Sequence, residues 1–293
     1  MRSVFSEDNY SAQPYVLTTS VRRFMAVGRM LLDTNNRPSA MGIATGVPGV
    51  GKTVAQQMLL VLLKSGEASI QCITVRVLPR STPGVLAEAL LAVLNVSHRV
   101  RGSSGSADAL AQAIRQQNLQ LLLLDNADYL NDACLDMLCH LTDTTACAVF
   151  MVGLHRFLER TLSRERLEYR VVIRLNFQPP AFEEVLHVVL PQLNFAGWIF
   201  NPANEADCHL AREIWSHTCP SLRRLCNLLS LASHLTQLRG EQTITRRAIR
   251  NTLDLIGSDE LLQTHTSAKN KGERRVSRRS EDISIEAKER GRI

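Results

Sequence analysis

The sequence predicts an α/β fold, in which a parallel β-sheet with helices on both faces is followed by a small all-helical domain. Apolar, strand-like runs alternate with helical runs up to about residue 175. A glycine-rich motif stands between the first of these strands and the next helix. After Pro179 and Pro180 only helical patterns remain. A β-α-β-α order requires crossover connections, which place helices on both faces of a parallel sheet.

The individual elements follow from the spacing of apolar residues. Apolar or β-branched runs predict strands over residues 41–45, 69–77, 119–125, 146–153 and 170–175. Apolar residues at helical spacing predict helices over residues 21–32, 53–64, 82–95, 106–117, 132–141 and 155–163. The same spacing predicts the all-helical part, with helices over residues 181–193, 203–218, 221–238 and 243–256.

Composition excludes several classes of protein. Of the 293 residues, 45% are hydrophobic and 21% are charged, as in ordinary globular chains. No apolar run is long enough to span a membrane, and the first residues show no apolar leader, so we expect a cytoplasmic protein whose seven cysteines are free thiols. The net charge is +6, but residues 261–293 alone hold nine basic and five acidic residues. The charge therefore does not by itself make the folded part a nucleic-acid binder.

The most specific motif fits GxxxxGK[ST] in full. Its members are Gly46, Val47, Pro48, Gly49, Val50, Gly51, Lys52 and Thr53. Glycines let the backbone fold around phosphates with its N–H groups pointing inward, and the following helix N-terminus adds positive potential. We expect Lys52 to contact the β- and γ-phosphates of ATP and Thr53 to hold Mg²⁺.

A second motif follows the four leucines of the strand over residues 119–125. Asp125 ends this strand, and we expect it to bind Mg²⁺ directly or through water. The next residue is Asn126, which cannot accept a proton at neutral pH, so hydrolysis is expected to be slow or absent. Asp128 is the candidate to act instead as the base that orients the attacking water.

Weaker candidates come from later segments. His155 is the candidate γ-phosphate sensor, or alternatively a solvent-facing residue at a helix start. Arg166 and Arg170 belong to a cluster with Arg164 and Arg174, from which one arginine is expected to reach a neighbouring subunit's ATP, whereas others form a solvated face. Arg223 and Arg224 open a helix of the second domain, where one of them is expected to contact nucleotide.

These motifs together resemble the AAA+ ATPases over roughly residues 20–257, and within them the transposition-regulator branch of Mu B-like proteins. Three stretches carry the likeness: Gly46–Ala55, the Leu124–Leu130 run LDNADYL and the Val149–Arg156 run VFMVGLHR. The resemblance adds Val54 to the nucleotide-binding residues. The apolar patterns and the tail's composition divide the chain into an N-terminal extension over 1–18, a nucleotide-binding domain over 19–178, a helical lid over 179–260 and a basic tail, expected to be disordered, over 261–293.

The resemblance further implies partners. Such proteins assemble with ATP and Mg²⁺ into rings or helical filaments on double-stranded DNA and present it to a transposase, in some cases with a target-selection protein. The implied DNA-phosphate contacts are Arg80, Arg99 and Arg101, although solubilising surface arginines would look the same. Two other functions stay open: an ATP-gated scaffold without DNA, and a replication-initiator or helicase-loader ATPase.

Overall fold

The computed structural model describes residues 16–33, 40–65, 70–96, 103–193, 199–219, 221–241 and 243–257. The predicted tail over residues 261–293 lies outside these residues, as does nearly all of the N-terminal extension. The chain divides into two compact units, Met1–Asn227 and Leu228–Ile293. This division does not test the predicted boundary between residues 178 and 179, which stays a prediction. In the described part, no helix is long and apolar enough to cross a membrane.

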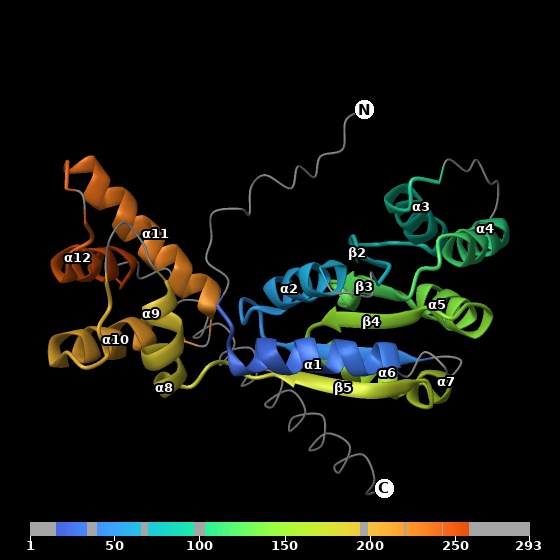
Figure 1. Cartoon of the computed structure of the whole chain (residues 1–293), viewed down its shortest axis with the longest axis horizontal. Helices are drawn as coiled ribbons and strands as arrows, with labels where there is room; N and C mark the ends of the chain where they lie inside the picture. The colour runs from blue at the N-terminus through green and yellow to red at the C-terminus, as the bar shows by residue number, and fades with distance from the viewer. Residues whose placement is uncertain are drawn as a thin grey trace, which may run out of the picture. The chain divides into compact units, whose positions relative to one another are not determined.

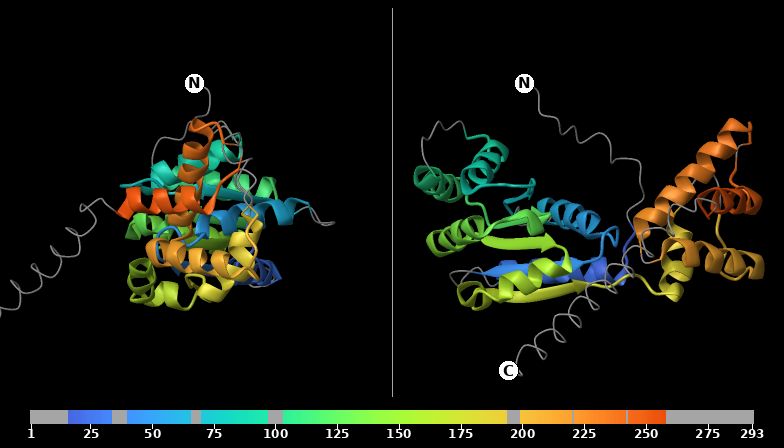
Figure 2. Two further views of the ribbon diagram at one scale, coloured as in Figure 1. Left: turned by 90° about the vertical axis from the view of Figure 1, so that its left-hand side faces the viewer. Right: turned by 180° about the vertical axis from the view of Figure 1, so that it is seen from behind.

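The first unit is built on a five-stranded parallel sheet with the order β2-β3-β4-β1-β5 (Figures 1 and 2). The strands are β1 (Met41–Gly46), β2 (Cys72–Arg76), β3 (Leu121–Asp125), β4 (Ala148–Gly153) and β5 (Val171–Phe177). The predicted α/β fold is therefore confirmed. Because the strands are parallel, their last residues share one side of the sheet, which we call the carboxyl edge. There Arg76 is in register with Asp125, and Gly46 with Phe177.

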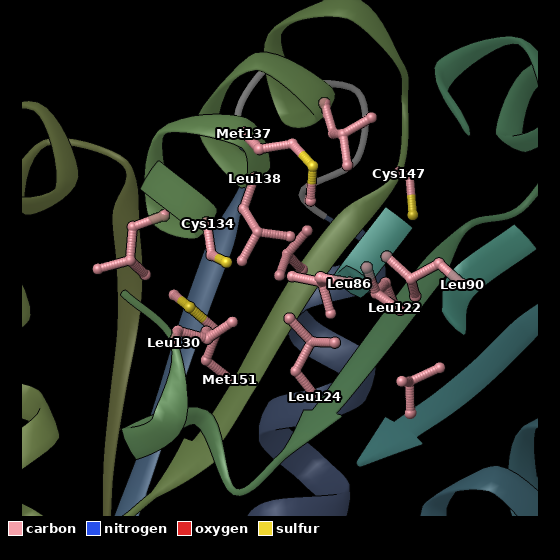
Figure 3. Close-up of a cluster of buried hydrophobic side chains, with 14 of the residues drawn as sticks. Leu86, Leu90, Leu122, Leu124, Leu130, Cys134, Met137, Leu138, Cys147 and Met151 are labelled. Atoms are coloured by element: carbon pink, nitrogen blue, oxygen red, sulfur yellow. The ribbon is translucent and has the colours of Figure 1, made fainter. Parts of the chain in front are cut away.

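Two helical layers cover the sheet (Figure 1). Buried residues of α1 (Thr19–Asp33) and α2 (Lys52–Lys64) pack on one face. The other face is covered by α3 (Pro83–Val93), α4 (Ser103–Gln116), α5 (Asp132–Thr144), α6 (His155–Leu162) and α7 (Glu165–Glu168). Figure 3 shows part of this second core, in which leucines of α3 and β3 meet α5. Alternate residues of β3 enter the two cores, which explains its run of four leucines.

Helices follow the sheet, as predicted. They are α8 (Phe182–Glu184), η4 (Val185–Val189), α9 (Leu190–Gln192), α10 (Glu205–Thr218), α11 (Leu222–Leu238) and α12 (Arg246–Gly257). The helix predicted over residues 181–193 contains a π-helical turn at η4, where the Leu190 N–H donates to the Val185 carbonyl. Pro191 has no N–H to offer the Val185–Val189 segment, which favours this wider turn. The described part of the second unit holds the remainder of α11, together with α12.

Candidate functional site

The glycine-rich loop lies between β1 and α2, at the carboxyl edge. Gly49 and Gly51 have φ angles of 78° and 103°, which side chains other than glycine rarely adopt. A Cβ on Gly49 would also lie 2.2 Å from the Ser221 Oγ. The Arg223 N–H donates to the Gly49 carbonyl over 3.1 Å. The sequence motif is therefore folded as a tight loop against the start of α11.

Lys52 begins α2 directly after this loop. Its Nζ donates to the carbonyls of Gly46 and Val47 over 2.7 and 2.9 Å, so the ammonium lies inside the curve of the loop. Burial lowers the pKa of Lys52, an effect that Asp125 and Asp128 oppose and Arg223 reinforces. The structure thus concentrates positive charge at the place where the motif predicts phosphates.

Thr53 and Asp125 meet across the carboxyl edge. The Thr53 hydroxyl donates to Asp125 Oδ2 over 3.0 Å, and Arg76 Nε lies 3.8 Å from the same oxygen. Asp125 is buried, and its Oδ1 accepts the Asn126 N–H over 3.0 Å. The two residues predicted to hold Mg²⁺, 72 positions apart in the chain, are therefore brought into direct contact.

Asn126 and Asp128 lie on the turn after β3, which includes the short helix η3 (Ala127–Tyr129). Asn126 has a φ of 57°, in the left-handed region that asparagine tolerates better than glutamate does. Asp128 is largely buried, and its Oδ2 lies 3.8 Å from a guanidinium nitrogen of Arg156. The backbone therefore accounts for asparagine at this position and holds a carboxylate two residues further on.

These groups surround a cavity of about 360 Å³, within the usual range for small-molecule sites. From the predicted nucleotide-binding set it is lined by Pro48, Gly49, Gly51, Lys52, Thr53, Val54 and Arg223. Asn126 and Asp128 also line it. Gly46, Val47, Val50 and Arg224 are not among its lining residues, so the arginine of the pair that faces the cavity is Arg223.

Other predicted residues lie away from the cavity. His155 is exposed, with its Nδ1 3.5 Å from the Thr45 hydroxyl, whereas the preceding Leu154 lines the cavity. Arg80 is exposed in the turn after β2, with a φ of 60°. Arg99 and Arg101 lie outside the described residues.

The arginine segment, residues 164–174, precedes and enters β5. Arg170 binds Asp143 through two hydrogen bonds of 3.2 and 2.8 Å, and this hydrogen bonding raises the pKa of Arg170. Arg164 lies 3.5 Å from Asp132 and from Asp136. Among the described residues Arg166 has no carboxylate partner. Arg170 adjoins Val171, which is in register with the first residue of β1, so it lies at the edge opposite the glycine-rich loop.

Sequence reasoning missed several residues of the cavity. They include Arg76, Gln57, Tyr129, Cys226 and Asn227. Arg76 could have been found, because it ends the strand that follows the loop and a parallel sheet places it beside the end of β3. Gln57 lies one helical turn after Thr53, which is also a readable signal.

Comparison with known proteins agrees with this geometry. A family model described as an AAA domain matches residues 36–162. The ORC2 protein of Aeropyrum pernix in ADPNP–ADP complexes is similar over 85% of this chain and 70% of its own, at 15% identity and a TM-score of 0.67. Drosophila ORC bound to DNA matches with 19% identity and a TM-score of 0.63, over 87% of this chain and 65% of that one.

Cdc6p of Pyrobaculum aerophilum is similar as well, at 17% identity and a TM-score of 0.65, over 83% of this chain and 68% of that one. No curated protein sequence matches the chain. At such identities the likeness establishes the fold. Residues 36–162 therefore match an AAA domain, and the fold of the chain is similar to that of the named ORC and Cdc6 structures.

Proposed function

We propose that this protein is an ATP-dependent, DNA-binding AAA+ ATPase whose nucleotide site is the cavity at the carboxyl edge. The observation that carries the proposal is the contact between Thr53 and Asp125 over 3.0 Å, next to the Lys52 ammonium. The charged residues lining the cavity are Lys52, Arg76, Arg223 and Asp128, and Asp125 lies against Thr53 and Arg76, so three cations face two carboxylates. Such an excess of positive charge suits a polyphosphate.

The residues present fit ATP and Mg²⁺. Lys52, Arg223 and the N–H groups at the start of α2 would hold the phosphates. Thr53 and Asp125 supply the oxygen ligands that Mg²⁺ prefers, and the ion, when bound, neutralises phosphate charge. Ser221 lies so close to Gly49 that only glycine fits at this position, so the loop is held against the residues that begin α11.

Hydrolysis is proposed to be slow. Asn126 offers an amide in place of a base, and the carboxylate that lines the cavity is that of Asp128, held near Arg156. Asp128 could orient water in a limited way. His155 would act only if it moved toward the cavity, and Arg166 or Arg170 only on a neighbouring subunit's nucleotide.

DNA binding is proposed on two supports. Arg80 projects from an exposed turn after β2, and an arginine of this kind can bind phosphate without reading sequence. A similar solved structure, that of Drosophila ORC, is described as bound to DNA. The likeness of three sequence stretches to Mu B-like proteins favours a regulator of transposition, which would oligomerise on target DNA and recruit a transposase.

A second candidate is a replication-initiator ATPase. The similar structures named above, of the ORC and Cdc6 type, favour it at least as strongly as the motifs favour transposition. The two candidates share the nucleotide chemistry and differ in DNA selectivity: a transposition regulator binds most duplexes, whereas an initiator prefers particular sites.

The experiment that tests the proposal is electron microscopy and DNA-binding titration of the full chain with ATP analogue, ADP or no nucleotide. We expect oligomers on duplex DNA with the ATP analogue alone, weakened by salt, and none with Lys52→Ala. Equal affinity for duplexes of random and of genomic sequence supports a transposition regulator. Higher affinity for particular genomic sequences supports an initiator. A protein that ignores DNA in every nucleotide state would contradict the DNA-binding role and leave a scaffold.

A further inference from the structure

One part of the cavity is aliphatic and lies next to the glycine-rich loop. A Cβ on Gly51 would stand 3.8 Å from Leu222 Cδ1 and 4.0 Å from Val21 Cγ2, so side chains of α11 and α1 meet there. Val189 and Leu193 add further aliphatic surface to the same cavity. This surface has no charge to offer a phosphate, but it suits an uncharged, flat ring.

Gln57 adds a polar group to the cavity. It lies four residues after Thr53 and three after Val54, so the three side chains share one face of α2. Gln57 lines the cavity, and its Oε1 is buried without a hydrogen-bond partner among the described residues. A buried acceptor without a donor is unfavourable, so this oxygen is suited to a ligand that brings an N–H group.

We propose that Gln57 is a specificity-determining residue that selects adenine, with its Oε1 accepting a hydrogen bond from the exocyclic 6-amino group. This inference rests on the proposed nucleotide-binding function. A base with a carbonyl at position 6 would present an acceptor to an acceptor, and a base with no substituent there would leave Gln57 Oε1 unpaired. Both are bound less tightly than adenine, because only adenine supplies the N–H group that pairs this buried oxygen.

The neighbouring residue supplies a matched control. Gln56 is 2% exposed, and neither its Oε1 nor its Nε2 has a hydrogen-bond partner among the described residues. It is not among the residues that line the cavity. Gln56→Met and Gln57→Met therefore make the same chemical change at adjacent positions of α2, one away from the cavity and one in it.

The test is isothermal titration calorimetry of the full chain with ATP and with purine riboside triphosphate, which lacks only the 6-amino group. We expect the wild type to bind ATP about tenfold more tightly, the effect of one hydrogen bond. Gln57→Met should reduce this ratio to about one while both nucleotides still bind. Gln56→Met should keep the ratio at about ten, and Gln57→Glu, which retains an acceptor at either oxygen, should also keep a preference for ATP.

The outcomes separate the two proposals. If the wild type binds ATP and purine riboside triphosphate equally tightly, the proposal that Gln57 selects adenine is wrong, while the proposed nucleotide site is unaffected. This result needs no variant. An unchanged tenfold ratio in Gln57→Met would also overturn that proposal. If the wild type binds neither triphosphate, or if Lys52→Ala binds ATP as well as the wild type does, the proposed function itself fails and the inference falls with it.

Discussion

The carboxyl edge and the arginine segment both concentrate charged side chains, but they use them differently. At the carboxyl edge, Lys52 donates to carbonyls rather than to a carboxylate, and Arg223 lines a cavity. In the arginine segment, Arg164 and Arg170 each lie against aspartates of α5. Charge that is left unneutralised around a cavity can bind a ligand, whereas charge that is paired mainly joins elements of the fold.

The first way to test this contrast is to remove the buried carboxylate of Asp125, which contacts Thr53 next to the cavity. Asp125→Asn should lower the affinity for Mg²⁺–ATP by roughly tenfold or more and leave the affinity for metal-free ATP within about twofold, because an amide is a weaker magnesium ligand. Titrations with and without Mg²⁺ measure both values. Asp136→Asn, which removes an exposed partner of Arg164, is the control and should change neither. Equal losses with and without Mg²⁺ would contradict the metal role.

A second change asks whether only the base is missing from the cavity. Asn126→Glu should raise ATP turnover about tenfold or more, since a positioned general base contributes at least that much. It should also cost about 1 kcal/mol of stability, because glutamate is strained at the φ of 57°. Asn126→Gly relieves the backbone without adding a base and should leave turnover unchanged. If Asn126→Glu turns over ATP no faster than Asn126→Gly, the site lacks more than a general base.

The arginine segment gives smaller effects, which differ between two of its members. Arg170→Ala should lower the unfolding temperature by about 2–4 °C, because it removes the paired contact with Asp143. Arg166→Ala should leave the unfolding temperature unchanged.

If Arg166 reaches a neighbouring subunit, mixing Arg166→Ala with Asp125→Asn subunits should restore some of the ATP turnover that each variant lacks alone. No recovery, with both proteins folded and assembled, would contradict this role.

The smallest effect concerns α2 beneath the glycine-rich loop. Gln56→Met should raise the unfolding temperature by about 1–3 °C, since it removes two buried amide atoms that have no partner among the described residues. Differential scanning calorimetry measures the change. A lower unfolding temperature would show that the Gln56 amide is hydrogen-bonded in solution.

Much of this arrangement could be predicted from the sequence. The glycine-rich motif and the four leucines before Asp125 each reflect a local constraint, and a parallel sheet then places both at one edge. The strand and helix order could be predicted for the same reason, since each element carries its own apolar period.

Other features depend on contacts between distant segments. The pairing of Arg170 with Asp143 needs α5 to return to the start of β5, and spacing alone does not show which arginine finds a carboxylate. The facing of Arg223 rather than Arg224 toward the cavity depends on how α11 meets the loop at Gly49. The π-helical turn at η4 is favoured by Pro191, and the spacing of apolar residues alone does not predict such a turn.

We propose that the excess of positive charge at the carboxyl edge forms a nucleotide site. The most direct test is a calorimetric titration of the full chain with Mg²⁺–ATP, comparing the wild type with Lys52→Ala and Lys64→Ala, since Lys64 lies on the same helix at its exposed far end. We predict that Lys52→Ala weakens binding roughly 100-fold, whereas Lys64→Ala stays within about twofold of the wild type. Equal affinities for all three proteins, or no binding by the wild type, would show that Lys52 and the carboxyl edge do not form a nucleotide site.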